Sequence, residues 1–267
     1  MLVLLLVLTV LSLGAAAVFL ALYQHERRER KRRSLRAACP IPTVPVEEVD
    51  PAFRPGPFGP GLDTEVTFVG TGPFVVEGGT SDGEAWILAV LAKRARRMFE
   101  FGTCTGKTSY LWARNAPPDA RVTTLTLAPD ERAEYHAEST DDPDDTSSAL
   151  NESAFTTFLY SGTPVEAKVE QLFGDSKSID VAPWAGRCDV VFVDGSHAYS
   201  YVINDSAKAL QLVRPGGLIL WHDYASPEHS PGVYRALNEL AKRLPLRRIS
   251  GTMLVVYRKP EVAARSA

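Results

Sequence analysis

The sequence predicts an α/β protein with a mostly parallel sheet, preceded by one transmembrane helix. Three observations carry this prediction. Short apolar runs alternate with stretches of helical spacing, a Gly-containing turn follows one of the first runs, and 22 residues near the N-terminus carry no charge. The chain has 267 residues, of which 45% are hydrophobic and 23% charged. This ordinary globular composition excludes disorder throughout and fibrous architectures.

The uncharged run extends from Leu2 to Tyr23, which is long enough as a helix to cross a hydrocarbon core of about 30 Å. Basic residues cluster between Arg27 and Arg36 and none precedes the run, so the positive-inside rule predicts that the rest of the chain is cytoplasmic. Three widely spaced cysteines fit a reducing compartment. A cleaved signal peptide is the alternative, because residues 15–17 are all alanine, but it would need a basic start and a shorter apolar core.

The remainder of the chain is acidic. The cluster holds seven basic residues together with Glu26 and Glu29, and removing them from totals of 29 basic and 32 acidic residues leaves 22 against 30, a net charge of −8. Such a body repels phosphate backbones, so no nucleic-acid partner is expected. Small molecules or lipids are the expected partners.

The chain divides into an anchor over residues 1–24, a basic and Pro-rich linker over 25–60, one folded domain over 61–259 and a tail over 260–267. Seven prolines between Cys39 and Gly61 disfavour helices, so this stretch is expected to be an extended spacer.

The domain begins with a helix, because Ser81 and Glu84 form a capping box before a run of helical spacing that reaches Arg94. The expected strands are Arg97–Phe101, Val122–Leu127, Ala167–Phe173, Asp189–Val193, Gly217–Trp221 and Met253–Tyr257, with helices such as Thr108–Arg114 and Tyr201–Val213 between them. The last two strands are expected to form a hairpin around Ser250 and Gly251. Residues 130–151 carry eight carboxylates and few large apolar side chains, which predicts a mobile acidic excursion.

The segment Glu100-Phe-Gly-Thr-Cys-Thr-Gly-Lys-Thr-Ser109 follows a strand and opens a helix, so Gly102 and Gly106 allow a ligand close to the backbone. A phosphate-binding Walker A loop needs four residues between its glycines, and this turn has three. A nucleotide hydrolase stays as an alternative, because the run from Asp189 to Asp194 can end in a magnesium-binding aspartate. The other interpretation is the acidic-x-Gly-x-x-x-Gly turn of S-adenosylmethionine enzymes, in which Glu100 accepts a hydrogen bond from the ammonium group of the donor.

Three further motifs follow this turn along the chain. They are Phe173-Gly-Asp-Ser176, Phe192-Val-Asp-Gly-Ser-His-Ala-Tyr199 and Arg214-Pro-Gly-Gly-Leu-Ile-Leu-Trp-His-Asp-Tyr224. In this order the four motifs resemble class I S-adenosylmethionine-dependent methyltransferases, in the family of small-molecule and sugar O-methyltransferases and cephalosporin-hydroxylase-like proteins. The resemblance spans about Gly70 to Lys259. It implies a Rossmann-like, doubly wound, mostly parallel seven-stranded sheet with a C-terminal antiparallel hairpin, and O-methylation of a small molecule, sugar or lipid.

The resemblance also implies roles for single residues. Donor-binding positions are Glu100, Gly102, Thr103, Gly106, Thr108, Asp175 and Asp194. Asp175 matches the position that accepts from the adenine amino group. The family commonly has an acid for the ribose hydroxyls where this chain has Thr126, and Asp130 is the nearest substitute.

Acceptor chemistry is expected after the fourth and fifth strands. Asp194 and His197 follow one strand and His222 and Asp223 follow the next, at the sheet edge where ligands bind in open α/β folds. Asp194, His222 and Asp223 can converge on one divalent metal such as Mg²⁺, which some relatives use to orient and acidify an acceptor hydroxyl. Without a metal, His197 is the expected general base, with Asp194 beside it.

Lesser expectations concern four other side chains. Cys104 is expected to pack under the donor and Lys107 to point to solvent, while Tyr199 and Tyr224 are candidates for the wall of the acceptor site. Because the ribose acid is missing, a methyltransferase fold that binds partners at a membrane without turnover is kept as an alternative.

Overall fold

The protein is described by a computed structural model, in which residues 14, 16, 18–25, 40–53, 64–65 and 79–261 are placed. The chain separates into two units, residues 1–40 and 41–267. In the first unit, residues 18–25 are helical. Among the placed residues no helix is long and apolar enough to span a bilayer, and most of the run from Leu2 to Tyr23 lies outside them.

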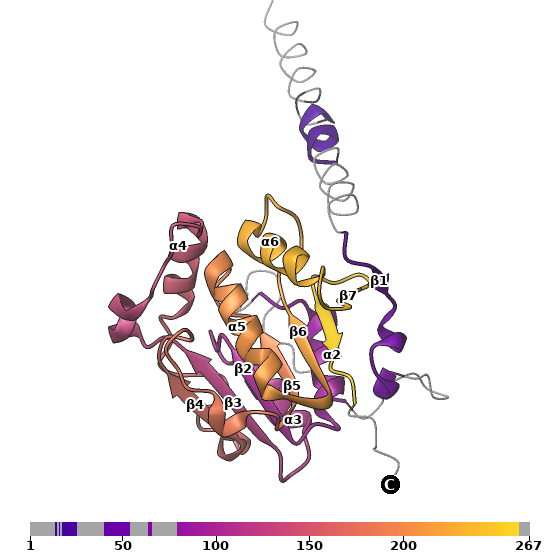
Figure 1. Cartoon of the computed structure of the whole chain (residues 1–267). Helices are drawn as coiled ribbons and strands as arrows, with labels where there is room; N and C mark the ends of the chain where they lie inside the picture. The colour runs from indigo at the N-terminus through magenta and orange to yellow at the C-terminus, as the bar shows by residue number, and fades with distance from the viewer. Residues whose placement is uncertain are drawn as a thin grey trace, which may run out of the picture. The chain divides into compact units, whose positions relative to one another are not determined.

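The second unit is built on a sheet in which eight strands of the described residues pair in the order β1-β7-β8-β6-β5-β2-β3-β4 (Figure 1). The strands are β1 (Thr43–Val44), β2 (Arg97–Phe101), β3 (Arg121–Thr126), β4 (Val169–Phe173), β5 (Cys188–Val193), β6 (Val213–Trp221), β7 (Arg247–Ile249) and β8 (Val255–Arg258). All pairings are parallel except those of β8 with β6 and β7. The expected mostly parallel α/β fold with antiparallel strands near its C-terminus is confirmed. The hairpin around Ser250 and Gly251 joins β8 to β7, a strand that was not among those expected, and not directly to β6.

Helices cover both faces of this sheet. They are α2 (Asp82–Ala92), α3 (Lys107–Asn115), α4 (Pro143–Glu152), α5 (Tyr199–Leu212) and α6 (Pro231–Leu240). The helices α5 and α6 pack together on one face and α2 and α3 on the other (Figure 1). The Ser81–Glu84 capping box that predicted α2 is present, with Glu84 N donating to Ser81 Oγ and Ser81 N donating to Glu84 Oε2.

The sheet has eight strands rather than the expected seven, because the Pro-rich stretch expected to be a spacer contributes β1. This strand lies at the sheet edge, where the carbonyls of Pro42 and Val44 accept hydrogen bonds from Arg248 and Ser250. Proline can join an edge strand in this way, because its carbonyl remains available although it has no N–H. Phe53, from the same stretch, is fully buried in the core.

The acidic segment over residues 130–151 contains an ordered helix, α4. Asp142 caps it by accepting from Asp144 N at 2.8 Å, and Pro143 occupies the first turn. Both residues are typical of a helix start, but the prediction for this segment relied on its many carboxylates and did not consider them.

Strand register brings the expected site residues to one edge of the sheet. Phe101 of β2 pairs with Leu125 of β3 and with Val193 of β5, and Val193 pairs in turn with Trp221 of β6. The residues that follow these strands therefore lie side by side at their carboxyl ends.

Candidate active site

A cavity of about 550 Å³, counted to its open mouth, lies at the carboxyl ends of β2 to β5. Its walls come from the four strand ends, from α4 and from α5. The lining residues are Phe101, Gly102, Cys104, Leu125, Thr126, Leu127, Tyr135, Ala149, Glu152, Ser153, Gly174, Asp175, Ser176, Asp194, Gly195, Ser196, Tyr201 and Asp205.

The two glycines of the first turn have different neighbours. Gly102 lines the cavity with φ +97°, and a Cβ there would lie 2.0 Å from the carbonyl oxygen of Asp194. Gly106 caps α3 with φ +79°, and its Cβ would lie 2.8 Å from Cε1 of Tyr160. Gly102 thus makes room for the backbone of Asp194 and Gly195, whereas Gly106 makes room for a tyrosine ring.

Glu100 lies beneath the turn and is absent from the cavity wall. Its side chain is 1% exposed, and Oε2 accepts from Ser109 Oγ at 2.6 Å and from Thr124 Oγ1 at 2.7 Å. Burial raises the pKa of Glu100 to about 8, against the lowering effect of these hydroxyl donors. In this arrangement Glu100 connects the start of α3 to β3.

Thr103 and Thr108 are buried as well, and neither lines the cavity. Because the Thr124 hydroxyl donates to Glu100, Thr103 Oγ1 must donate to Thr124 Oγ1, 2.8 Å away. Thr103 then accepts from Gln171 Nε2 at 3.2 Å. These threonines, expected to bind the donor, belong to the buried support of the turn.

Other expected donor positions do reach the cavity. Asp175 lines it while accepting from Lys177 N at 3.0 Å and lying 3.0 Å from Nδ1 of His136. Thr126 and Cys104 also line it, and Cys104 takes the strained φ of 45°. Asp130, the expected substitute for the ribose acid, is exposed and lies outside the lining.

Two tyrosines in the cavity wall were not anticipated from the sequence. The rings of Tyr135 and Tyr201 stack with centroids 4.4 Å apart and planes 16° apart. Lys177 Nζ lies 4.4 Å from the Tyr201 centroid, and Tyr135 Oη lies 2.7 Å from Ser196 Oγ. Tyr135 comes from the segment expected to be mobile and Tyr201 from a helix start, so neither pattern indicated a site.

Acidic side chains line the cavity, and burial raises the pKa of Asp194 and raises that of Asp205 to about 6. Glu152, Asp175, Asp194 and Asp205 line it, and no Lys or Arg is among its lining residues in the described part of the chain. The expectation that Lys107 points to solvent is wrong. It is buried and its Nζ donates to the carbonyl of Thr80 at 2.6 Å, because the turn preceding α2 packs over the start of α3.

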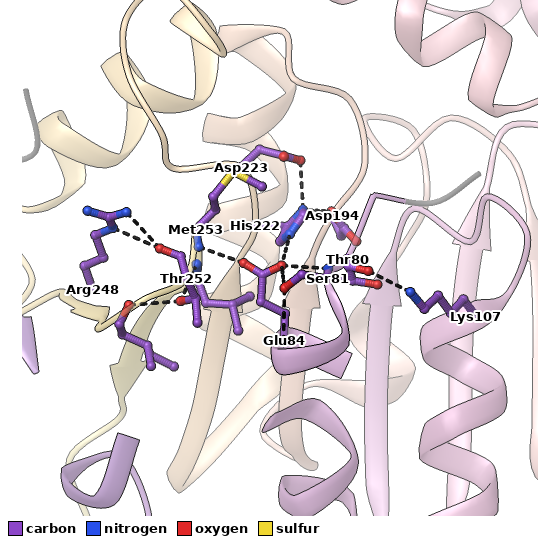
Figure 2. Close-up of polar contacts among 12 residues, drawn as sticks. Thr80, Ser81, Glu84, Lys107, Asp194, His222, Asp223, Arg248, Thr252 and Met253 are labelled. Carbon is purple, nitrogen blue, oxygen red and sulfur yellow. Dashed lines mark hydrogen bonds and ion pairs between the residues drawn. The ribbon is translucent and has the colours of Figure 1, made fainter. Parts of the chain in front are cut away.

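A second cavity of about 220 Å³ adjoins the first at Asp194, and it contains the predicted metal residues. One ligand atom from each of Asp194, His222 and Asp223 lies within 4.8 Å of the others (Figure 2). His222 Nδ1 lies 3.1 Å from Asp194 Oδ1 and 3.0 Å from Asp223 Oδ2. We call these three residues the Asp-His-Asp cluster. Asp223 takes φ 60°, a left-handed conformation that is uncommon for residues other than glycine and that Asp adopts more readily than most.

The expected general base, His197, is turned toward this cluster. Its Nε2 lies 2.8 Å from Oδ2 of Asp223. Burial would lower the pKa of His197, but the Asp223 carboxylate outweighs burial and raises it to about 9. Nε2 therefore acts as a donor to Asp223 in this arrangement.

The candidates for the acceptor wall lie elsewhere. Tyr199 donates to Glu239 at the surface, and Tyr224 is fully buried and donates to Asn238. Neither lines the two cavities.

Glu84 joins the cluster from α2, a role that its place in a capping box did not indicate. Its Oε2 lies 3.3 Å from His222 Nε2, and its Oε1 accepts from Met253 N at 2.7 Å (Figure 2). Burial would raise the pKa of Glu84, yet the donors from His222, Met253 and Ser81 lower it to about 2, so it is ionised. For His222, burial would lower the pKa, but Asp194 and Asp223 raise it well above its usual value.

A family model described as a methyltransferase domain matches residues 99–224, from β2 through the end of β6. Residues 99–224 form a methyltransferase domain. The match spans all four motifs, and it confirms the resemblance to methyltransferases that these motifs predicted.

Similar proteins match either at low identity or over a short segment. The O-methyltransferase TomG of Streptomyces achromogenes, involved in tomaymycin synthesis and solved with S-adenosylmethionine, is 24% identical over 68% of this chain and 82% of its own, with a TM-score of 0.46. An O-methyltransferase of Bacillus cereus, solved with S-adenosylhomocysteine, is 18% identical over 67% of this chain and 82% of its own, with a TM-score of 0.44. The uncharacterized protein R132 of Acanthamoeba polyphaga mimivirus is 40% identical over 52 residues, which cover 20% of this chain and 24% of the viral protein.

Proposed function

We propose that this methyltransferase domain transfers a methyl group from S-adenosylmethionine to an oxygen of a small molecule, sugar or lipid. The main support for this proposal is the set of acidic side chains that line the cavity at the strand ends. Its described lining has four carboxylates and neither Lys nor Arg, in a domain that matches methyltransferases. Such a lining attracts a cationic ligand and repels a polyphosphate.

The residues of the cavity fit this donor in shape and charge. S-adenosylmethionine, when bound, supplies an electrophilic methyl group on a positively charged sulfur. Gly102 lines the first cavity at the strand end, and Asp194 lines both cavities. The stacked Tyr135 and Tyr201 offer an apolar wall for a flat base.

The second cavity is proposed as the place of the reacting hydroxyl. Because methyl transfer is an in-line displacement, the chain must mainly hold the two reactants in one line and accept the hydroxyl proton. Asp194 is the proposed proton acceptor there, because burial raises the pKa of its carboxyl group. Asp223 already accepts from His197 Nε2, and although burial would raise its pKa, His222 lowers it. A divalent metal held by the Asp-His-Asp cluster would, when bound, polarise the acceptor hydroxyl and lower its pKa.

Two other functions are less well supported. A nucleotide hydrolase requires cationic groups around the phosphates, and Lys107 is instead bound to the carbonyl of Thr80. A binding protein without turnover would explain Thr126 in place of the ribose acid. The methyl-transfer assay described below distinguishes such a binding protein from an enzyme.

We also propose that residues 1–24 anchor the chain in a membrane with the methyltransferase domain on the cytoplasmic side. Support comes from the uncharged run and the basic cluster that follows it. Residues 18–25 also expose apolar side chains, among them Phe19 at 74%. Membrane fractionation of the full chain, with and without residues 1–24, tests this: the anchor predicts that only the full chain stays with membranes after an alkaline wash.

The experiment for methyl transfer uses the full chain with S-adenosylmethionine labelled with ¹³C in the methyl group, and an extract of small molecules and lipids. Magnetic resonance of the products separates methyl groups on oxygen from those on nitrogen, sulfur or carbon. We expect new O-methyl signals that disappear with the Asp194→Asn variant. Label on nitrogen alone, or none with a chain that binds the donor, would overturn the proposal.

A further inference from the structure

The Asp-His-Asp cluster contains a mixed set of ligand atoms, one imidazole nitrogen and two carboxylates. Mg²⁺ favours oxygen ligands alone, whereas imidazole suits Zn²⁺ and Fe²⁺, and Mn²⁺ suits the two carboxylates while binding mixed ligand sets more tightly than Mg²⁺ does. Which metal such a cluster accepts depends on which ring nitrogen of His222 faces it, and whether that nitrogen can supply a lone pair.

The second ring nitrogen of His222 settles its orientation. Nε2 lies 3.3 Å from Oε2 of Glu84, an oxygen that already accepts hydrogen bonds from Ser81 N and Ser81 Oγ and therefore acts as an acceptor. Nε2 therefore carries the hydrogen, and Nδ1 is the nitrogen that faces Asp194 and Asp223. His222 is 3% exposed, so water does not compete for either nitrogen.

Glu84 is itself held from two directions. Its Oε2 accepts from Ser81 N at 2.9 Å and from Ser81 Oγ at 2.8 Å, and its Oε1 accepts from Met253 N at 2.7 Å (Figure 2). One carboxylate thus connects the start of α2, the β7–β8 hairpin and the end of β6. Glu84 is 1% exposed, and it cannot turn away from His222 without breaking these bonds.

We infer that Glu84 is a positioning residue, which fixes the ring and tautomer of His222 so that the Asp-His-Asp cluster binds Mn²⁺ or Zn²⁺ in preference to Mg²⁺. Metal-binding histidines almost always donate their other ring N–H to an oxygen of this kind, and the contact tunes affinity. His197 gives Asp223 the matching support, with Nε2 at 2.8 Å from Oδ2. The inference rests on the cluster and not on methyl transfer, so its failure would leave the proposed function standing.

The test measures metal binding directly on the full chain after chelator treatment, by calorimetry with Mn²⁺, Zn²⁺ and Mg²⁺ and by the paramagnetic resonance of free Mn²⁺. The wild type is expected to bind Zn²⁺ more tightly than Mn²⁺, and Mn²⁺ more tightly than Mg²⁺. Glu84→Gln should weaken Mn²⁺ binding roughly 10–100-fold. Asp82→Asn removes the same charge from the first turn of α2 and should leave Mn²⁺ binding unchanged.

A second variant tests the ligand itself. His222→Asn replaces the imidazole by a shorter neutral amide with an oxygen donor, so the preference for Mn²⁺ over Mg²⁺ should shrink. With Zn²⁺ bound to the wild type, nitrogen resonances of His222 should show hydrogen on Nε2 and none on Nδ1, a readout independent of whether Glu84→Gln folds.

Three results would overturn the inference. They are a wild type that binds no divalent metal or prefers Mg²⁺, a folded Glu84→Gln that binds Mn²⁺ as tightly as wild type, and a hydrogen found on Nδ1 of zinc-bound His222.

Discussion

Replacing Glu100 by Gln tests whether this carboxylate is a buried support of the glycine turn. The Glu100 side chain is 1% exposed, and its pKa is raised from 4.5 to about 8. At neutral pH the folded chain therefore holds a neutral acid with one acceptor oxygen for Ser109 and Thr124. An amide has the same shape, one acceptor oxygen and hydrogen donors, so Gln should fit without loss of either bond.

The magnitude follows from the difference between the folded and unfolded pKa. Below pH 4.5 the carboxyl is protonated in both states. Between pH 4.5 and 8 the unfolded chain ionises Glu100 while the folded chain keeps the proton, so the stability of the wild type falls relative to Glu100→Gln. The full difference corresponds to roughly 5 kcal/mol above pH 8, and to about 3 kcal/mol at pH 7.

The assay is denaturant unfolding of both chains at several values between about pH 5 and pH 9, with Glu170→Gln as control. Glu170 lies on the edge strand β4 of the same sheet and is exposed, so its replacement should change stability by less than about 0.5 kcal/mol. A difference between wild type and Glu100→Gln that stays constant across this range would refute the burial of a neutral Glu100. It would favour an ionised Glu100 that is available to a cationic donor.

Two further substitutions test the cavity. Gly102→Ala places a Cβ 2.0 Å from the Asp194 carbonyl oxygen, so it should lower the free energy of unfolding by more than about 3 kcal/mol or prevent folding. The control is Gly162→Ala, where φ is +71° and no atom beyond its chain neighbours lies within 4 Å of the new Cβ. It should lower the free energy of unfolding by only about 1 kcal/mol in the same assay. Equal costs would contradict the close approach. Tyr201→Ala removes one of the two stacked rings in the cavity wall and should weaken S-adenosylmethionine binding by roughly 1–3 kcal/mol in calorimetry. Tyr199→Ala, at the surface, is the control and should leave this binding unchanged. A larger loss of binding in Tyr199→Ala than in Tyr201→Ala would show that the donor binds elsewhere.

The position of the site was predictable because its residues directly follow parallel strands. A motif that ends an apolar run fixes the edge of the sheet to which its polar residues belong, and the register of β2, β5 and β6 then brings Asp194, His222 and Asp223 together. No knowledge of side-chain packing was needed for this inference.

The orientation of single side chains was not predictable in the same way. Glu100 and Gly102 are two residues apart, yet one is buried beneath the turn and the other lines the cavity. The direction of Glu100 depends on hydroxyls from β3 and α3, which only the assembled sheet brings near. Lys107 likewise finds its partner in Thr80, a residue 27 positions earlier.

Where a residue has two roles, the sequence pattern indicated only the simpler role. A Glu three residues after a Ser is sufficient to explain a capping box, so Glu84 carried no sign of its contact with His222, which lies 138 residues further along the chain. The prolines around Thr43 similarly predicted an extended spacer, and this prediction missed the edge strand that the same residues form.

The most direct measurement of the central claim is calorimetric titration of the full chain with S-adenosylmethionine and, separately, with ATP, each with and without a divalent metal. Because the described lining of the cavity has four carboxylates and neither Lys nor Arg, S-adenosylmethionine is expected to bind and ATP is not. Binding of ATP alone, or of neither ligand by a folded chain, would contradict the assignment of this methyltransferase domain as an S-adenosylmethionine-dependent enzyme.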